Sequence, residues 1–230
     1  MTRWKPQVKY KHMKALLILL IFAFVSVLGL AQNPSIKVID TDFSKGRLQN
    51  VQAITLNDAA KLHGHLCDGL VVGFLGLKET LYKLYPDSII DRTNNRIVSK
   101  SSPCLTDIAI FMTGARYQYN TYYVSDSIKY LFIVQRIDNK KAFGVRLKSG
   151  LKPAAIDSLG RLATKGELDA CDIDSLRKLE SEFSKFLLSK NPQDLFIIEE
   201  IKNYKWLPVL NGNFLKTDVL NKKLQNCLPK

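Results

Sequence analysis

The segment from Leu62 to Gly69, with the sequence LHGHLCDG, constrains the fold of this chain more than any other. Two of the three histidines of the protein lie in it, two residues apart, and Cys67 follows after two more. Imidazole and thiolate side chains bind zinc and similar divalent metals, so the segment indicates a metal site. On one continuous helix His63 and Cys67 would share a face and His65 would point away. The glycines inside the segment therefore predict a bend that gathers the three side chains; the alternative is a helix–loop–helix joint whose histidines only cap or pack.

The first 31 residues have the pattern of a secretory signal peptide. Five basic residues and no acidic one precede an apolar run from Ala15 to Leu30, and small residues occupy positions 29 and 31. This order of basic, apolar and small-residue regions predicts export with cleavage after Ala31. The alternative is a retained anchor helix, since a run of about sixteen residues is just short of the usual spanning length. We expect a periplasmic or secreted protein that has no membrane contact after cleavage.

Cleavage of the signal peptide would also lower the net charge of the protein. The chain of 230 residues carries a formal charge of +13, but removal of residues 1–31 takes five of its 34 basic residues away and leaves 29 against 21 acidic ones, or +8. Such a mildly basic surface outside the cytoplasm does not predict nucleic acid as a partner. With 46% hydrophobic and 24% charged residues, the composition is that of an ordinary globular protein.

The elements between Gln32 and Gly150 predict an α+β core in which an antiparallel sheet packs against a long central helix. That helix follows Gly69, has a broad apolar face and is ended by a proline. Ser102 and Pro103 predict the start of another helix, because a capping hydroxyl followed by proline is typical of a first turn. Aromatic and β-branched residues predict one short strand and then three strands in meander order, at 95–100, 119–124, 130–135 and 141–147.

The region after Gly150 is expected to be a helical extension that packs on the core. Its expected helices are 153–163, 173–189 and 194–204. We therefore divide the chain into a signal peptide at 1–31, a metal-binding α+β core at 32–150 and a helical C-terminal extension at 151–230.

All four cysteines lie after the expected cleavage site, where an oxidising compartment would permit disulfides. Cys67 and Cys104 both stand at the start of an expected helix, where unpaired N–H groups and the helix dipole favour the thiolate. They are therefore candidate ligands or nucleophiles; the alternative is that both are buried and act as small apolar residues. If a disulfide exists, Cys171 with Cys227 is the pair that we favour.

Together these residues predict one pocket for a zinc-like divalent transition-metal ion. His65, Cys67 and Cys104 are expected to line it, with His63 as a fourth ligand or a neighbour. Two cysteine ligands of one zinc ion would put their sulfurs roughly 4 Å apart.

Three further residues are candidates for supporting the ligands or for contacting a bound molecule. Asp68 follows Cys67 directly. Asp107 lies three residues after Cys104, on the same face of its helix, and could orient a ligand, bind the metal or be only a polar residue of the first turn. Arg116, just beyond this helix, is a candidate contact for an acidic ligand.

The segment HGHLCDG at 63–69, followed by CLTD at 104–107 and MTG at 112–114, resembles the FmdE family, which is associated with formylmethanofuran dehydrogenase. The resemblance covers roughly residues 56–147. It implies an α+β core, often dimeric, in which histidines and cysteines line a metal-binding pocket, and thus a homodimer. The chain departs from the family pattern at Asp68, where proline is usual, at Ala115, where a second cysteine is usual, and in lacking a paired-cysteine finger near its C-terminus.

Three functions remain open on this basis. The first is an exported metal-binding protein that also takes a small ligand. The second is a metal-dependent enzyme acting on a small molecule, with Asp107 as general base. The third is a thiol-redox protein that uses Cys67 and Cys104 without a metal. Four ligands would close the metal site, whereas three would leave a position for water or substrate.

Overall fold

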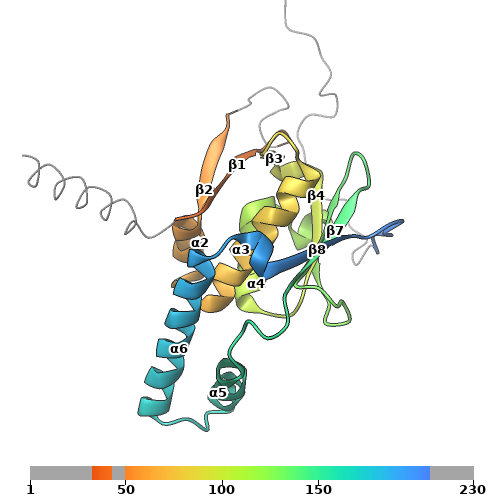
Figure 1. The fold of residues 1–230 in the computed structure, drawn as a ribbon. Coiled ribbons are helices and arrows are strands. Elements are labelled where there is room, and N and C mark those ends of the chain that lie inside the picture. Colours follow the sequence, from red (N-terminus) through yellow and green to blue (C-terminus); the bar gives the residue numbers. More distant parts are fainter. Residues whose placement is uncertain (1–32, 43–49, 208–230) are drawn as a thin grey trace, which may run out of the picture. The chain divides into compact units, whose positions relative to one another are not determined.

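The computed structural model describes residues 33–42 and 50–207, which fall within one compact unit. It contains both helices and strands, and the strands form two sheets, so the predicted α+β class is confirmed (Figure 1). The expected signal peptide lies outside the described residues. Within the described ranges, no helix has the length and apolar character needed to cross a membrane.

The two sheets are of unequal size. The smaller has the order β2–β1–β3, formed by Gln52–Thr55, Ser35–Ile39 and Ile89–Asp91. The larger has the order β5–β4–β6–β7–β8, formed by Tyr122–Val124, Asn95–Ser99, Phe132–Arg136, Ala142–Leu147 and Phe196–Glu200. Short 3₁₀ turns at Arg92–Asn94 and Tyr117–Tyr119 precede β4 and β5.

The meander expected from residue 119 onward is wrong in the pairing of its first strand, β5. β5 pairs in parallel with β4, Ile97 opposite Tyr122, and not with β6. The reason is that α4 (Pro103–Thr113) connects β4 to β5, and a helical crossover returns the chain in the same direction. β6 and β7 are antiparallel, as expected. The larger sheet is therefore mixed.

The helix expected at 194–204 is also wrong. α7 (Pro192–Leu195) is a single turn, and β8 follows it and pairs antiparallel with β7, Phe196 opposite Leu147. The sequence Phe-Ile-Ile at the start of β8 suits a half-buried strand, so the helix that starts at Pro192 ends after one turn. β8 thus adds a strand from after Gly150 to the larger sheet.

α3 (Asp68–Leu84) has 17 residues, of which twelve are buried. It packs against α4, α6 and β7, and Phe74 on it is fully buried. Because apolar side chains surround the helix on several sides, its N-terminal end is held firmly in place. This end begins at Cys67.

α5 (Ala154–Thr164) and α6 (Ala170–Ser189) confirm the other two helices expected after Gly150. α6 packs on α3, and α5 packs on α6. Figure 1 shows the two as a helical hairpin that extends away from the sheets. The packing of α6 on α3 brings residues of the C-terminal part close to the N-terminal end of α3.

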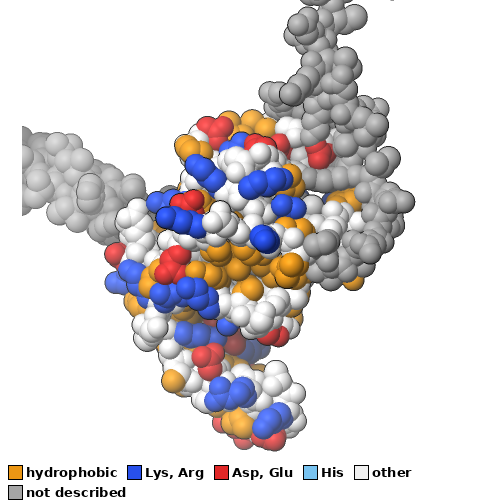
Figure 2. Space-filling view, turned by 90° about the vertical axis from the view of Figure 1, so that its right-hand side faces the viewer, with side chains coloured by type: hydrophobic (Ala, Val, Ile, Leu, Met, Phe, Trp, Pro, Cys, Tyr) orange, Lys and Arg blue, Asp and Glu red, His pale blue; other side chains and the backbone are white. Residues whose placement is uncertain are grey.

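A second, smaller apolar cluster includes Val98 and Ile133 of the larger sheet and Tyr130, just before β6. Nearby, the Arg96 guanidinium lies over the ring of Trp206, 5.3 Å from its centroid. Figure 2 shows hydrophobic side chains gathered at the centre of one face, with basic and acidic side chains around them. On this face the Lys and Arg side chains form several separate groups, with acidic side chains near them.

Candidate metal centre

The joint between α2 (Leu56–His63) and α3 forms the bend that the sequence predicts. Gly64 ends α2 with φ at 97°, a left-handed conformation that residues with a side chain rarely adopt. Cys67 is already the N-cap of α3, and its Sγ accepts a hydrogen bond from the Leu70 N–H. One potential ligand atom from each of His63, His65 and Cys67 lies within 4.8 Å of the others.

α4 brings a second cysteine to this joint. Cys104 is the second residue of α4, as predicted, and its Sγ lies 3.4 Å from the Sγ of Cys67 and 3.6 Å from Nε2 of His63. Gly69 makes this approach possible, because a Cβ there would lie 2.9 Å from the Cys104 sulfur. The starts of α3 and α4 are therefore in direct contact at the two thiols.

These separations suit the donor atoms of one tetrahedral ion. With metal–sulfur bonds near 2.3 Å and metal–nitrogen bonds near 2.0 Å, two sulfurs lie about 3.8 Å apart and a sulfur and a nitrogen about 3.5 Å. The observed 3.4 Å and 3.6 Å differ from these values by only a few tenths of an ångström. A disulfide would need about 2 Å, so Cys67 and Cys104 are free thiols.

Asp107 fixes the ring of His63. Its Oδ2 lies 2.7 Å from Nδ1 of His63, whose side chain is only 7% exposed. This hydrogen bond raises the pKa of His63. With Nδ1–H donating to the carboxylate, the lone pair of Nε2 faces Cys104, which is the arrangement typical of metal-binding histidines. Of the roles weighed for Asp107, orienting a ligand fits the geometry best.

The two thiols are unequal. The hydrogen bond between them lowers the pKa of Cys104 to about 7 and, together with burial, raises the pKa of Cys67 well above its ordinary value. Cys104 also lies in the first turn of α4, where free N–H groups favour a negative sulfur. The shared hydrogen bond therefore favours the thiolate at Cys104 over one at Cys67.

Charged residues from the C-terminal part border the cluster, and the sequence did not single them out. The buried Asp68 carboxylate lies 3.7 Å from Nζ of Lys152, which is 2.7 Å from Asp157. On α6, burial and the charge of Asp68 raise the pKa of Glu180, whereas Lys152 and His65 lower it. No local pattern identifies Lys152 or Glu180, because both come close to Asp68 only through tertiary packing: Lys152 lies in the loop between β7 and α5, and Glu180 lies on α6.

Arg116 lies at the opposite end of α4 from Cys104. The eleven residues of this helix, at 1.5 Å per residue, separate its two ends by about 16 Å. The Arg116 guanidinium lies over the ring of Tyr119, 5.6 Å from its centroid. The structure thus brings together His63, His65, Cys67 and Cys104, with Asp68 and Asp107 beside them, and does not bring Arg116 to the same place.

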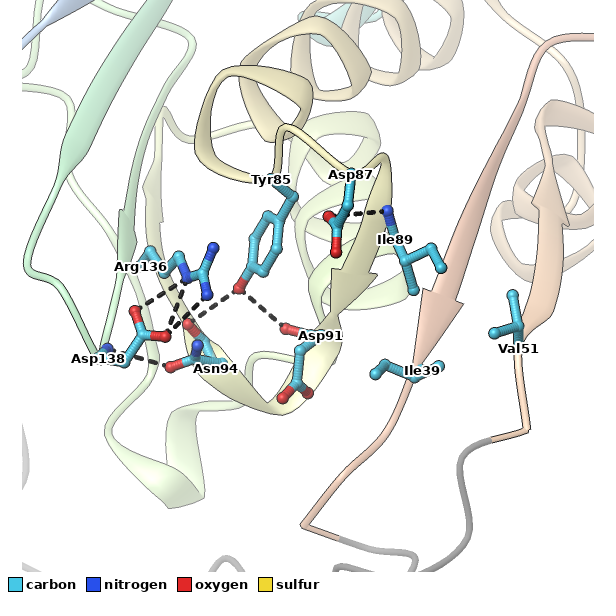
Figure 3. Close-up of a pocket in the computed structure, with 9 residues that line it drawn as sticks. All are labelled: Ile39, Val51, Tyr85, Asp87, Ile89, Asp91, Asn94, Arg136 and Asp138. Atoms are coloured by element: carbon cyan, nitrogen blue, oxygen red, sulfur yellow. Dashed lines mark hydrogen bonds and ion pairs between the residues drawn. The ribbon is translucent and has the colours of Figure 1, made fainter.

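A cavity of about 410 Å³ lies at the other end of α3 (Figure 3). Its lining includes Tyr85, Asp91, Arg136 and Asp138, and no histidine or cysteine. These groups have partners: Arg136 donates to both Asp138 oxygens and to the last carbonyl of α3, and the Tyr85 hydroxyl lies within hydrogen-bond distance of the backbone oxygens of Asp91 and Asn94, just before β4. The cavity is therefore separate from the cluster of histidines and cysteines.

Comparison with known families places part of the chain in a described family. A family model described as "FmdE, Molybdenum formylmethanofuran dehydrogenase operon" matches residues 62–197. This range is more than half of the chain, includes all four candidate ligands and reaches into β8. No curated protein matches the chain significantly.

Proposed function

The chain belongs to the FmdE family, and from this premise we propose that it is an exported protein that holds one zinc-like divalent ion. The ligands would be His63, His65, Cys67 and Cys104. The observation that carries the proposal is that the sulfurs of Cys67 and Cys104 and Nε2 of His63 lie at separations suited to one tetrahedral ion, with a ligand atom of His65 within 4.8 Å of those of His63 and Cys67. A mixed set of nitrogen and sulfur donors favours zinc over magnesium or calcium, which prefer oxygen.

The export part of the proposal depends on residues 1–31. Their basic, apolar and small-residue regions are typical of a cleaved signal peptide. The protein would then act in the periplasm or outside the cell, and cytoplasmic partners such as nucleic acid are not expected.

A small ligand would reach the ion from the side of His65. The other candidate ligands are at least partly buried, whereas His65 is exposed. If the His65 imidazole gives way to a donor from a ligand, the site becomes open with three protein ligands. The ligand would then meet Lys152 and the carboxylates of Asp68 and Glu180, so its polar groups would have partners of both signs.

Asp107 supports metal binding better than general-base catalysis. A general base must be free to accept a proton from the substrate, but the Asp107 carboxylate is engaged with His63. The metal-dependent enzyme that uses Asp107 as its base is therefore the less favoured function.

The experiment is elemental analysis of the protein purified from the compartment to which it is exported. Overexpression in the cytoplasm would load zinc according to availability and mislead. Wild type and Cys171→Ser should contain about one transition-metal ion per chain, and Cys67→Ser and Cys104→Ser much less, since each loses one of four donors. Metal content at background level in wild type, or equal content in all four proteins, would overturn the proposal.

A further inference from the structure

The separation of the Cys67 and Cys104 sulfurs is close both to that of two zinc ligands and to that of a disulfide. At 3.4 Å, the two sulfurs lie slightly closer than two ligands of one zinc ion, at about 3.8 Å, and about 1.4 Å farther apart than in a disulfide. Both thiols lie at helix starts, and these starts pack closely because Gly69 has no side chain: a Cβ there would lie 2.9 Å from the Cys104 sulfur. A small movement of either side chain therefore reaches either state.

We infer that this pair is a redox switch for the metal: a peroxide joins the two sulfurs in a disulfide and thereby releases the ion. The inference rests on the proposed function, because the ion must be bound before it can be released. It adds a regulation of the site, in which the metal-bound form and the disulfide form exclude each other.

The chemistry balances with hydrogen peroxide as the oxidant. One thiolate attacks a peroxide oxygen, the O–O bond breaks, and a sulfenic acid and hydroxide form. The second thiolate then displaces hydroxide from the sulfenic sulfur and closes the S–S bond. Two electrons pass from the two sulfurs to the peroxide, and two protons turn the two hydroxides into water.

The metal leaves because the thiolate, and not the disulfide, is the ligand. Oxidation removes two of the four donors and leaves only His63 and His65. Of these, His65 is exposed, so water competes with it for the ion. The same exposed side gives a small oxidant access to the sulfurs, which are themselves only partly buried.

Cys171 provides a matched control within the same chain. It is the second residue of α6, as Cys104 is the second residue of α4, and it is exposed and free. Cys227, the partner that we favoured for a disulfide with Cys171, lies outside the described residues. Both thiols therefore lie in a helix first turn, but in the described part of the chain only Cys104 has a second sulfur within contact distance. If helix position alone made a thiol sensitive, Cys171 would react as Cys104 does.

The test treats the zinc-containing full chain with hydrogen peroxide and follows two quantities. A colorimetric chelator measures released zinc, and mass spectrometry of peptides after thiol blocking identifies disulfides. We expect about one zinc ion released for each Cys67–Cys104 disulfide formed, and recovery of zinc binding after reduction with a phosphine. The Cys171→Ser variant should behave as wild type does.

Two results would overturn the inference in distinguishable ways. Zinc that is bound at the start and is lost while Cys67 and Cys104 become separate sulfinic acids, or zinc that stays bound throughout, refutes the switch and leaves the metal-binding function standing. Protein that binds no zinc before peroxide is added refutes the proposed function, and the switch with it.

Discussion

Asp107 is the residue on which the orientation of His63 depends. Its carboxylate holds Nδ1 at 2.7 Å, and this hydrogen bond directs Nε2 toward Cys104. A metal-binding imidazole that lacks such a partner can adopt the wrong tautomer and is free to rotate. The strength of metal binding should therefore depend on a residue that is not itself a ligand.

Replacement of this carboxylate should weaken the site without removing a ligand. Asp107→Asn should weaken zinc binding by about 10- to 100-fold, because an amide oxygen accepts the Nδ1 hydrogen bond without a charge. Competition with a chelator of known affinity measures the change. Asp174→Asn, at an exposed position on α6, is the control and should leave the affinity unchanged. Equal affinity in both variants would mean that Asp107 does not position the ligand.

Gly69 sets the distance between the two helix starts. In Gly69→Ala, the new Cβ would lie 2.9 Å from the Cys104 sulfur, so the Cys104 side chain or the start of α3 must shift from its present position. We expect zinc affinity to fall by about tenfold or more, as when ligand placement is disturbed.

Gly160→Ala is the matched change, since a Cβ at that position in α5 meets no atom within 4 Å. Its zinc affinity should stay at the wild-type value, and its stability should rise by roughly 0.5–1 kcal/mol, the usual gain for Ala over Gly inside a helix. Unchanged zinc affinity in Gly69→Ala as well would show that the close contact at Gly69 is not needed.

At the scale of single residues, the sequence predicts the ligands better than their surroundings. His63, His65 and Cys67 are adjacent in sequence, and residue type with two glycines was enough to propose that they converge. Cys104 followed from its position at a helix start. The positions of Lys152, in the loop after β7, and of Glu180, on α6, depend on tertiary packing against α3, which no local pattern encodes.

Among the elements, α3 supports the cluster by being buried along most of its length. Phe74 on α3 is fully buried, and its truncation would leave a cavity beneath α4, α6 and β7. We predict that Phe74→Ala lowers the free energy of unfolding by about 3–5 kcal/mol. Denaturant unfolding of the metal-free protein measures this value.

Phe186→Ala is the control for this substitution. Phe186 lies on α6 with 37% of its surface exposed, so less apolar surface is lost and the cost should stay below about 1 kcal/mol. A similar cost for both phenylalanines would contradict the role of α3 as the buried element.

The elements also show where sequence patterns fail. Helices with strong caps and periodic apolar faces were predicted within a few residues. The pairing of β5 and the strand β8 were not predicted, because both depend on residues elsewhere in the chain. β5 pairs with β4 after the crossover through α4, and β8 pairs with the edge of β7. Local propensity says little about such pairings.

At the scale of the whole molecule, the cellular compartment sets the redox conditions around the candidate metal site. An exported protein meets an oxidising environment, in which a thiol pair is protected by its metal or converted to a disulfide. The prediction is that the mature exported protein begins at Gln32, which N-terminal sequencing tests. Full-length chain recovered from the membrane fraction would show that the apolar segment is retained as an anchor.

The central claim is that two imidazoles and two thiolates from the α2–α3 joint and from α4 bind one ion. X-ray absorption spectroscopy at the zinc edge of the zinc-containing protein measures these donors directly. The structure predicts about two sulfurs near 2.3 Å and two nitrogens near 2.0 Å, with one sulfur fewer in Cys104→Ser. A shell of nitrogen and oxygen alone, or a wild-type spectrum that Cys104→Ser leaves unchanged, would contradict the account.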